Sequence, residues 1–208
     1  MFTGIIEEIG KIISVTDKKI KIQASVVLCD TKIGDSIAVN GVCLTVTNIG
    51  SDNFEADISP ETYRITALKE LKSSDCVNLE RAMPANGRFG GHIMSGHIDG
   101  IGKIILFEKI SDSYNLKIAL DEKELKYTVK KGSIGVNGIS LTIANIEKNF
   151  IEISVIPHSF EKTNLKNLKI GNSVNIEVDI ISKYVEKFLS TSDNKTGISM
   201  EFLAENGF

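Results

Sequence analysis

The segment Val39-Asn40-Gly41-Val42-Cys43-Leu44-Thr45-Val46 decides the fold, because it recurs as Val136-Asn137-Gly138-Ile139-Ser140-Leu141-Thr142-Ile143. Five of the eight positions are identical, and two others exchange valine for isoleucine. In each copy an Asn-Gly pair separates two apolar runs that alternate with period two, the strongest short-range signal for a β-hairpin. The chain therefore contains the same predicted hairpin twice, 97 residues apart.

The repeat extends across both halves of the sequence. The matched pairs at the same offset are Pro60 with Pro157, Leu68 with Leu165, and residues 77–80 with residues 174–177. Residues 3–12 match residues 95–104 at an offset of 92, so the copies differ by one small change in length. Colinear matches over this distance indicate an internal duplication, and two copies are too few for a solenoid or a propeller.

Within the first copy, the pattern is that of short strands. Residues 1–15 and 20–26 flank a polar turn at 16–19 and form a predicted hairpin, and the predicted hairpin at the Asn-Gly turn follows. Further strands are expected at 53–58 and 76–80, with one or two helical turns between them in 61–71. Six short strands with little helix favour a small closed barrel over a doubly wound sheet. The duplication then predicts an all-β protein of two tandem barrels.

Beyond the second copy, the pattern becomes helical over about residues 179–190. The apolar residues at helical spacing are Ile180, Ile181, Tyr184, Val185, Phe188 and Leu189. Such a stripe is consistent with a helix packed on its own barrel, or with one that meets copies of itself in an oligomer, which we favour. Residues 191–196 are polar and expected to be mobile, and residues 200–204 can form a last helical turn.

Composition excludes several classes of function. The net charge of -3 argues against a surface for nucleic acid or for an anionic membrane. No run of eighteen apolar residues occurs, so we expect no membrane span, and the first residues lack the features of a signal peptide.

The cysteines and histidines predict neither a disulfide framework nor a metal site. Cys29, Cys43 and Cys76 form no CxxC pair and leave one thiol over, which favours a reducing, cytoplasmic location. His92 and His97 are five residues apart, and on a strand they would point to opposite faces.

Comparison of the two copies shows where their chemistry differs. The unlike pairs are Cys43 with Ser140, Ile5 with His97, and Glu61 with His158. We therefore expect two similar pockets at barrel ends, one with a thiol and the other with a hydroxyl and an imidazole. Such a pair fits an enzyme that binds two like molecules and treats them differently. The sequence contains no phosphate loop, dinucleotide fingerprint, GxSxG elbow or HExxH motif.

Each of these residues also has a structural interpretation. Cys43 fits a small buried hydrophobe, and His97 fits a strand histidine whose ring is hydrogen-bonded to the backbone. Thr45 and Thr142 fit ordinary strand threonines, His158 an exposed loop residue and Arg64 a solvated or salt-bridged arginine. His92 precedes the repeat, and we expect it to be structural.

Several segments taken together resemble the riboflavin synthase (alpha chain) family of lumazine-binding double barrels. They are residues 1–6 (MFTGII), 40–45 (NGVCLT), 90–97 (GGHIMSGH), 138–142 (GISLT) and 201–208 (EFLAENGF). The resemblance covers essentially the full chain. It implies two six-stranded Greek-key barrels, over residues 1–90 and 91–178, and a C-terminal helix and tail, residues 179–208, that assemble a homotrimer. It leaves open whether a lumazine synthase associates with the chain.

The resemblance also implies a reaction and a site. The reaction is dismutation of two 6,7-dimethyl-8-ribityllumazine molecules by four-carbon transfer, with no added cofactor, at a site between the first barrel of one subunit and the second barrel of another. The first pocket would comprise Gly4, Ile5, Ile6, Cys43, Leu44, Thr45, Asp57, Ile58, Ser59, Pro60, Glu61 and Thr62. The second would comprise Gly96, His97, Ile98, Lys131, Ser140, Leu141, Thr142, Ser154, Val155, Ile156, Pro157, His158 and Ser159.

Four of these residues carry groups suited to proton transfer or nucleophilic activation: Cys43, His97, Ser140 and Thr142. The sequence does not decide which of them acts as the base. Two rival classes remain, a non-catalytic lumazine- or flavin-binding antenna protein and an unrelated structural double barrel. Antenna proteins tend to lose pocket polarity in one copy, whereas both copies are polar here.

Overall fold

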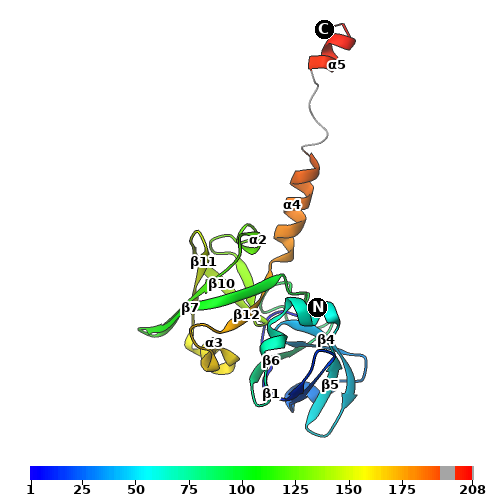
Figure 1. Ribbon diagram of the computed structural model, residues 1–208, viewed down its shortest axis with the longest axis vertical. Helices are drawn as coiled ribbons and strands as arrows, with labels where there is room; N and C mark the ends of the chain where they lie inside the picture. Colours follow the sequence, from blue (N-terminus) through cyan, green and yellow to red (C-terminus); the bar gives the residue numbers. More distant parts are fainter. Residues whose placement is uncertain (193–199, 208) are drawn as a thin grey trace.

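The computed structural model describes residues 1–192 and 200–207. Figure 1 shows two β-barrels side by side and a helix, α4, that projects away from them. The strands of the first barrel are β1 (Glu8–Val15), β2 (Lys19–Gln23), β3 (Ser36–Val39), β4 (Val42–Ile49), β5 (Asn53–Asp57) and β6 (Cys76–Arg81). Those of the second are β7 (Gly100–Ile110), β8 (Ser113–Ala119), β9 (Ser133–Val136), β10 (Ile139–Ile146), β11 (Phe150–Val155) and β12 (Ser173–Val178).

Both barrels close with the same strand order. The first runs β1-β2-β5-β4-β3-β6, and the second gives the same cycle when its strands are numbered from β7. Every strand pair is antiparallel. The predicted all-β fold of two six-stranded barrels is therefore confirmed, and each predicted strand of the first copy is present.

Short helices connect the strands. They are η1 (Val26–Leu28), α1 (Pro60–Ile65), η2 (Ala67–Glu70), α2 (Glu122–Leu125), α3 (Pro157–Lys162) and η3 (Asn164–Asn167). The pairs α1–η2 and α3–η3 occupy equivalent positions between the fifth and sixth strand of each barrel, where helical turns were predicted for the first copy. Proline begins both α1 and α3, since its fixed φ suits the first helical position.

The Asn-Gly turns form tight hairpins and also join the barrels. Asn40 and Gly41 have φ values of 46° and 80°, and Asn137 and Gly138 have 45° and 78°, as a type I′ turn requires. The two turns face each other: a Cβ placed on Gly41 would lie 2.7 Å from the Gly138 nitrogen. A side chain at either glycine would therefore force the barrels apart.

Buried asparagines tie the two turns together. The Asn78 amide donates to the Asn137 carbonyl over 2.9 Å, and the Asn175 amide donates to the Asn40 carbonyl over 2.9 Å. Asn78 and Asn175 are equivalent in the two copies, so the barrels are related by a local two-fold axis that passes between the turns. Because buried amides must be hydrogen-bonded, these contacts help fix how the barrels are oriented.

Each barrel is preceded by an extended segment, here called an arm, which packs against the other barrel. The first arm is residues 1–7, before β1, and the second is residues 93–99, before β7. Ile98 belongs to the apolar core of the first barrel, whereas Ile6 packs against the core of the second. The two arms also pair with each other, since the Phe2 amide donates to the Met94 carbonyl over 2.8 Å. The barrels thus exchange equivalent segments within one chain.

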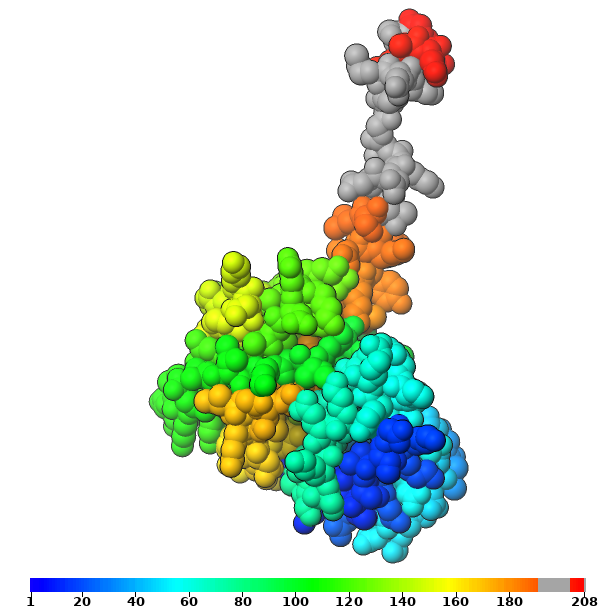
Figure 2. All heavy atoms as spheres, in the orientation of Figure 1, coloured from blue at the N-terminus to red at the C-terminus, as the bar shows by residue number. Residues whose placement is uncertain are grey.

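The C-terminal helix α4 (Ile180–Ser192) is present as predicted and is followed by α5 (Met200–Glu205). The predicted polar segment 191–196 lies mostly outside the described residues. Ile181, Tyr184, Val185, Phe188 and Leu189 are half or more exposed, although Ile181, Val185 and Leu189 line a cavity with residues 126–133 of the second barrel. Figures 1 and 2 show α4 extending away from the barrels. Over the described parts of the chain, no helix is both long and apolar enough to cross a bilayer.

Candidate functional site

The crossed arms place Gly4 of the first arm against Ser140 of the second barrel, and Gly96 of the second arm against Cys43 of the first barrel. The Ser140 amide donates to the Gly4 carbonyl over 2.9 Å, and the Cys43 amide donates to the Gly96 carbonyl over 2.9 Å. A Cβ on Gly4 would lie 2.5 Å from the Ser140 nitrogen, and one on Gly96 would lie 2.6 Å from the Cys43 Cβ. Both glycines also have a positive φ, 78° and 79°, so no other residue fits easily.

The main-chain contacts of the predicted site residues cross between the barrels. The family resemblance implies that residues 4–6 belong to the pocket of Cys43 and residues 96–98 to the pocket of Ser140. In the structure the Gly96 carbonyl contacts Cys43 and the Gly4 carbonyl contacts Ser140, whereas Ile5 lines the cavity of the first barrel. The exchange of arms explains the crossed contacts, which the repeat pattern alone does not reveal because both packings satisfy it equally.

His92 lies at the second of these positions. Its Nδ1 is 2.7 Å from the Ser140 Oγ, and the residue is only 7% exposed. Burial lowers the pKa of His92 below its usual 6.5, and the carboxylate of Asp179 acts in the opposite direction. The ring is therefore neutral near pH 7, and in the tautomer protonated at Nε2 its Nδ1 accepts a hydrogen bond from the Ser140 hydroxyl.

His92 was expected to be structural because it precedes the repeat. The structure buries it and hydrogen-bonds it to Ser140, a predicted catalytic residue. Its Nε2 is buried, with no hydrogen-bond partner among the described residues. The sequence signal that pointed to it is its place, five residues before His97, in the glycine-rich segment that joins the copies.

Two serines that the sequence reasoning missed lie beside the predicted threonines. Ser36 on β3 is the cross-strand partner of Thr45 on β4, and Ser133 on β9 is the partner of Thr142 on β10. Directly opposed residues point to the same face of a sheet, so each barrel presents a pair of hydroxyl groups. A serine at the start of a strand carries no distinctive sequence signal.

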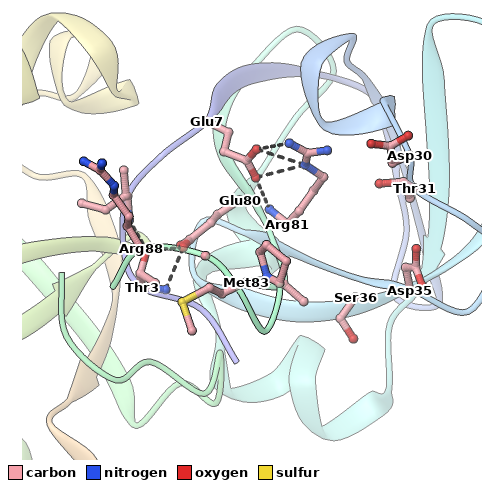
Figure 3. Close-up of a pocket in the computed structure, with 14 residues that line it drawn as sticks. Thr3, Glu7, Asp30, Thr31, Asp35, Ser36, Glu80, Arg81, Met83 and Arg88 are labelled. Atoms are coloured by element: carbon pink, nitrogen blue, oxygen red, sulfur yellow. Dashed lines mark hydrogen bonds and ion pairs between the residues drawn. The ribbon is translucent and has the colours of Figure 1, made fainter. Parts of the chain in front are cut away.

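Each of these serines lines a cavity at the same place in its barrel. Figure 3 shows the first cavity, about 600 Å³, which Ser36 lines together with Ile5 and the ion pair of Glu7 and Arg81. Ser133 lines the second, about 690 Å³. The walls differ: residues of the segment 82–88 close the first cavity, whereas α4 closes the second.

Other predicted residues fall into two groups. The side chains of Leu44, Ile58, Ile98, Leu141 and Val155 belong to the barrel cores, so only their main chains can face a ligand. The remaining predicted residues lie at the surface or half-buried, namely Ile5, Ile6, Cys43, Thr45, Asp57, Ser59, Pro60, Glu61, Thr62, His97, Lys131, Ser140, Thr142, Ser154, Ile156, Pro157, His158 and Ser159.

The helix after the fifth strand of each barrel, α1 or α3, begins with a different cap in the two copies. Ser59 caps α1 by accepting the Thr62 amide over 3.0 Å, whereas Ile156 at the start of α3 has no side-chain cap. Arg64 pairs with Glu61, which lowers the pKa of that carboxyl, so the salt-bridged interpretation of Arg64 is confirmed. His158 is exposed, as expected for the residue after Pro157.

No group of three His, Cys, Asp or Glu side chains within the described ranges is arranged to hold a metal ion. Side chains supply reactive groups at both positions. The first offers a thiol beside the arm that carries His97, and the second offers a serine hydroxyl hydrogen-bonded to a neutral imidazole.

Taken together, these features define a duplicated barrel protein with an equivalent cavity in each copy. The family described as "Lumazine binding domain" matches the chain twice, over residues 3–82 and 95–179. The chain belongs to this lumazine-binding family. Each match covers one repeat, in agreement with the duplication found in the sequence.

Similar proteins point in the same direction. The chain is 48% identical to a riboflavin synthase of Actinobacillus pleuropneumoniae and 46% identical to one of Bacillus subtilis, with 100% of each chain covered. Among solved structures, LumP complexed with riboflavin has a TM-score of 0.78 and 28% identity, and covers 86% of this chain and 99% of its own. LumP complexed with 6,7-dimethyl-8-(1'-D-ribityl) lumazine has a TM-score of 0.76 and 27% identity, with the same coverage.

Proposed function

We propose that this chain is a riboflavin synthase, which converts two 6,7-dimethyl-8-ribityllumazine molecules into riboflavin and 5-amino-6-(D-ribitylamino)uracil. The observation that carries the proposal is the pair of equivalent positions with unlike chemistry, Cys43 beside one arm and the Ser140–His92 pair beside the other. Two equivalent positions with unlike groups suit a reaction in which one substrate molecule gives four carbons to an identical one. Full-length identity to named riboflavin synthases supports the assignment.

The reaction requires a proton to leave the C7 methyl group of one lumazine and a nucleophile to add to C7 of the other. The neutral His92 can accept a proton through Ser140, which would make the second position a general base or activate its hydroxyl as a nucleophile. His97, Thr142 and Cys43 are the further candidates. Holding two rings in a reactive arrangement can itself supply several kcal/mol, of the order of 7 to 11 in the most favourable cases.

We propose further that the active protein is a homotrimer whose site lies between two subunits. The exposed apolar stripe of α4 supports this, because a surface stripe of Ile181, Tyr184, Val185 and Leu189 is costly in water without a partner. Ion pairs hold the helix in its projecting position: Lys183 with Asp99, and Lys126 with Glu186.

The three free cysteines fit a reducing cytoplasm, where we place the protein.

The decisive test is incubation of the purified protein with 6,7-dimethyl-8-ribityllumazine and no other additive. We expect riboflavin to appear, with one molecule formed for every two lumazines consumed, as chromatography would quantify. If a fluorescence titration shows that lumazine binds but no riboflavin forms, the chain is instead an antenna-type binding protein. Absence of both binding and product would leave a structural double barrel.

A further inference from the structure

Two carboxylates that the mechanism does not use are buried at equivalent places in the two barrels. Glu80 on β6 is 4% exposed and Glu177 on β12 is 3% exposed. Among the described residues, neither carboxylate forms an ion pair, although Arg81 and Lys183 pair with carboxylates nearby. A buried carboxylate is costly unless hydrogen bonds compensate for its lost hydration, so its partners indicate what it does.

The partners of Glu80 all belong to the first arm. Its Oε1 accepts the Thr3 amide over 2.7 Å and the Thr3 hydroxyl over 2.7 Å, and its Oε2 accepts the Gly4 amide over 3.0 Å. The Thr3 Oγ1 accepts in turn from the Ile5 amide over 3.3 Å. A chain of hydrogen bonds therefore leads from the buried carboxylate to Ile5, which lines the first cavity together with Thr3 and Glu80. Figure 3 shows the contact of Glu80 with Thr3.

Glu177 makes the same set of contacts with the second arm. Its Oε1 accepts the Ser95 amide over 2.6 Å and the Ser95 hydroxyl over 2.7 Å, and its Oε2 accepts the Gly96 amide over 3.1 Å. The Ser95 Oγ accepts from the His97 amide over 3.2 Å. Here the chain of hydrogen bonds ends on a candidate catalytic residue.

The electrostatic surroundings of the two groups are also alike. Burial raises the pKa of both carboxyls above their usual 4.5, and the donors from each arm act in the opposite direction. The nearest like charges are equivalent too, Glu7 for Glu80 and Asp99 for Glu177, and each adds to the increase in pKa. Among the described residues, the hydrogen bonds that offset the lost hydration of these carboxylates all come from the arms, so each carboxylate holds its arm in place.

Each arm passes this constraint to the opposite barrel. The Glu80 carboxylate accepts the Gly4 amide, and the Gly4 carbonyl in turn accepts the Ser140 amide. The Ser140 side chain is hydrogen-bonded to His92. Glu177 fixes Gly96, whose carbonyl accepts the Cys43 amide. The carboxylate on one barrel therefore acts on the reactive position of the other.

We propose that Glu80 and Glu177 are positioning residues that each align one half of the catalytic machinery across the barrel junction. Glu80 aligns Ser140 and His92, and Glu177 aligns Cys43 and His97. The catalytic consequence rests on the proposed function, whereas the structural linkage does not. Within the described structure neither carboxylate is hydrogen-bonded to Cys43, His92, His97 or Ser140, and both act through the backbone of the arms.

The test compares the matched variants Glu80→Gln and Glu177→Gln in the full chain without ligand. Glutamine keeps the size of the side chain but replaces one acceptor oxygen with a donor, which then opposes an arm amide. With ¹³C-labelled histidine rings, we expect Glu177→Gln to shift the NMR signal of His97 and to accelerate alkylation of Cys43. Glu80→Gln should shift the signal of His92 and leave Cys43 unchanged.

His158 serves as the internal control, because it lies on exposed α3 outside both chains of hydrogen bonds. General loosening of the fold would move the same signals in both variants, and that result would overturn the proposal. So would folded variants in which neither assigned reporter changes. If a glutamine variant does not fold, Thr3→Val and Ser95→Ala remove only the hydroxyl link and should give the same pattern to a smaller degree.

Kinetics with the lumazine substrate complete the test. Small displacements of reacting groups lower the rate of the chemical step, so we expect each glutamine variant to lower kcat about 10-fold or more with less change in KM. Glu55→Gln, on the outer face of β5 beside Lys21, should leave both parameters unchanged. If the wild-type protein forms no riboflavin, the proposed function fails, whereas the NMR and alkylation results still decide whether the linkage exists.

Discussion

The two barrels share one backbone plan and differ in the groups that they place on it. Both have the same strand cycle, the same Asn-Gly turn and the same buried glutamate that holds an arm. One presents a thiol at the equivalent position and the other a serine bonded to an imidazole. One cavity is closed by the connecting segment 82–88 and the other by α4. Duplication thus supplied two cavities at equivalent places, and substitutions and flanking segments make their walls and their reactive groups unlike.

Removal of the structure that distinguishes the second cavity should have the largest effect. Truncation after Asp179 deletes α4, one wall of that cavity, and the exposed stripe proposed to assemble the trimer. We expect a folded, monomeric protein with almost no activity, as measured by light scattering and by riboflavin formation. A truncated monomer with full activity would contradict a site shared between subunits.

The crossing of the arms can be broken at its glycines. Gly96→Ala places a Cβ 2.6 Å from that of Cys43 in a backbone with a φ of 79°. Strain and overpacking together should lower the free energy of unfolding by about 2 to 4 kcal/mol. Gly34→Ala is the matched control, since Gly34 has a φ of 96° but open space around it, and should cost about 1 kcal/mol. Equal losses in denaturant unfolding would contradict the close approach.

The imidazole that only the second position has can be removed alone. His92→Gln should lower kcat by about 100-fold, within the range of general base catalysis, whereas Glu55→Gln on the outer face of β5 should leave it unchanged. A variant with wild-type kcat would exclude the Ser140–His92 pair from the reaction.

His92 also predicts a pH dependence of stability. Because burial lowers its pKa below 6.5, the unfolded chain takes up the proton first as the pH falls. The contribution of the neutral ring is therefore complete above pH 6.5 and decreases below it, until the folded protein is protonated as well. Denaturant unfolding at several pH values should show this decrease in the wild type and not in His92→Gln.

The smallest change makes the two positions alike. Cys43→Ser gives the first barrel the hydroxyl that Ser140 provides in the second. The side chains are similar in size, so we expect an unchanged fold and lumazine affinity, and a fall of about 10-fold in kcat if the thiol takes part. Unchanged kcat would show that the unlike side chains at this pair of positions are not what separates the two roles.

Much of the fold followed from local patterns in the chain. The Asn-Gly turns require a positive φ that these residues tolerate, and alternation with period two identified the strands on either side. The apolar spacing after residue 179 identified α4. The candidate site was predicted in part: Cys43 and Ser140 occupy matched positions, but His92, Ser36 and Ser133 gained their significance only from their neighbours in space.

The sequence by itself determined the duplication, the turns, the strand pattern and the positions at which the copies differ, because each depends on neighbouring residues or on comparison of the chain with itself. Tertiary structure alone decided which barrel each arm packs against, that the two turns meet, and that a histidine outside the repeat reaches Ser140. The reason is the symmetry of the duplication. Equivalent arms satisfy the local pattern equally well on either barrel, and only the packing of both barrels together distinguishes the two arrangements.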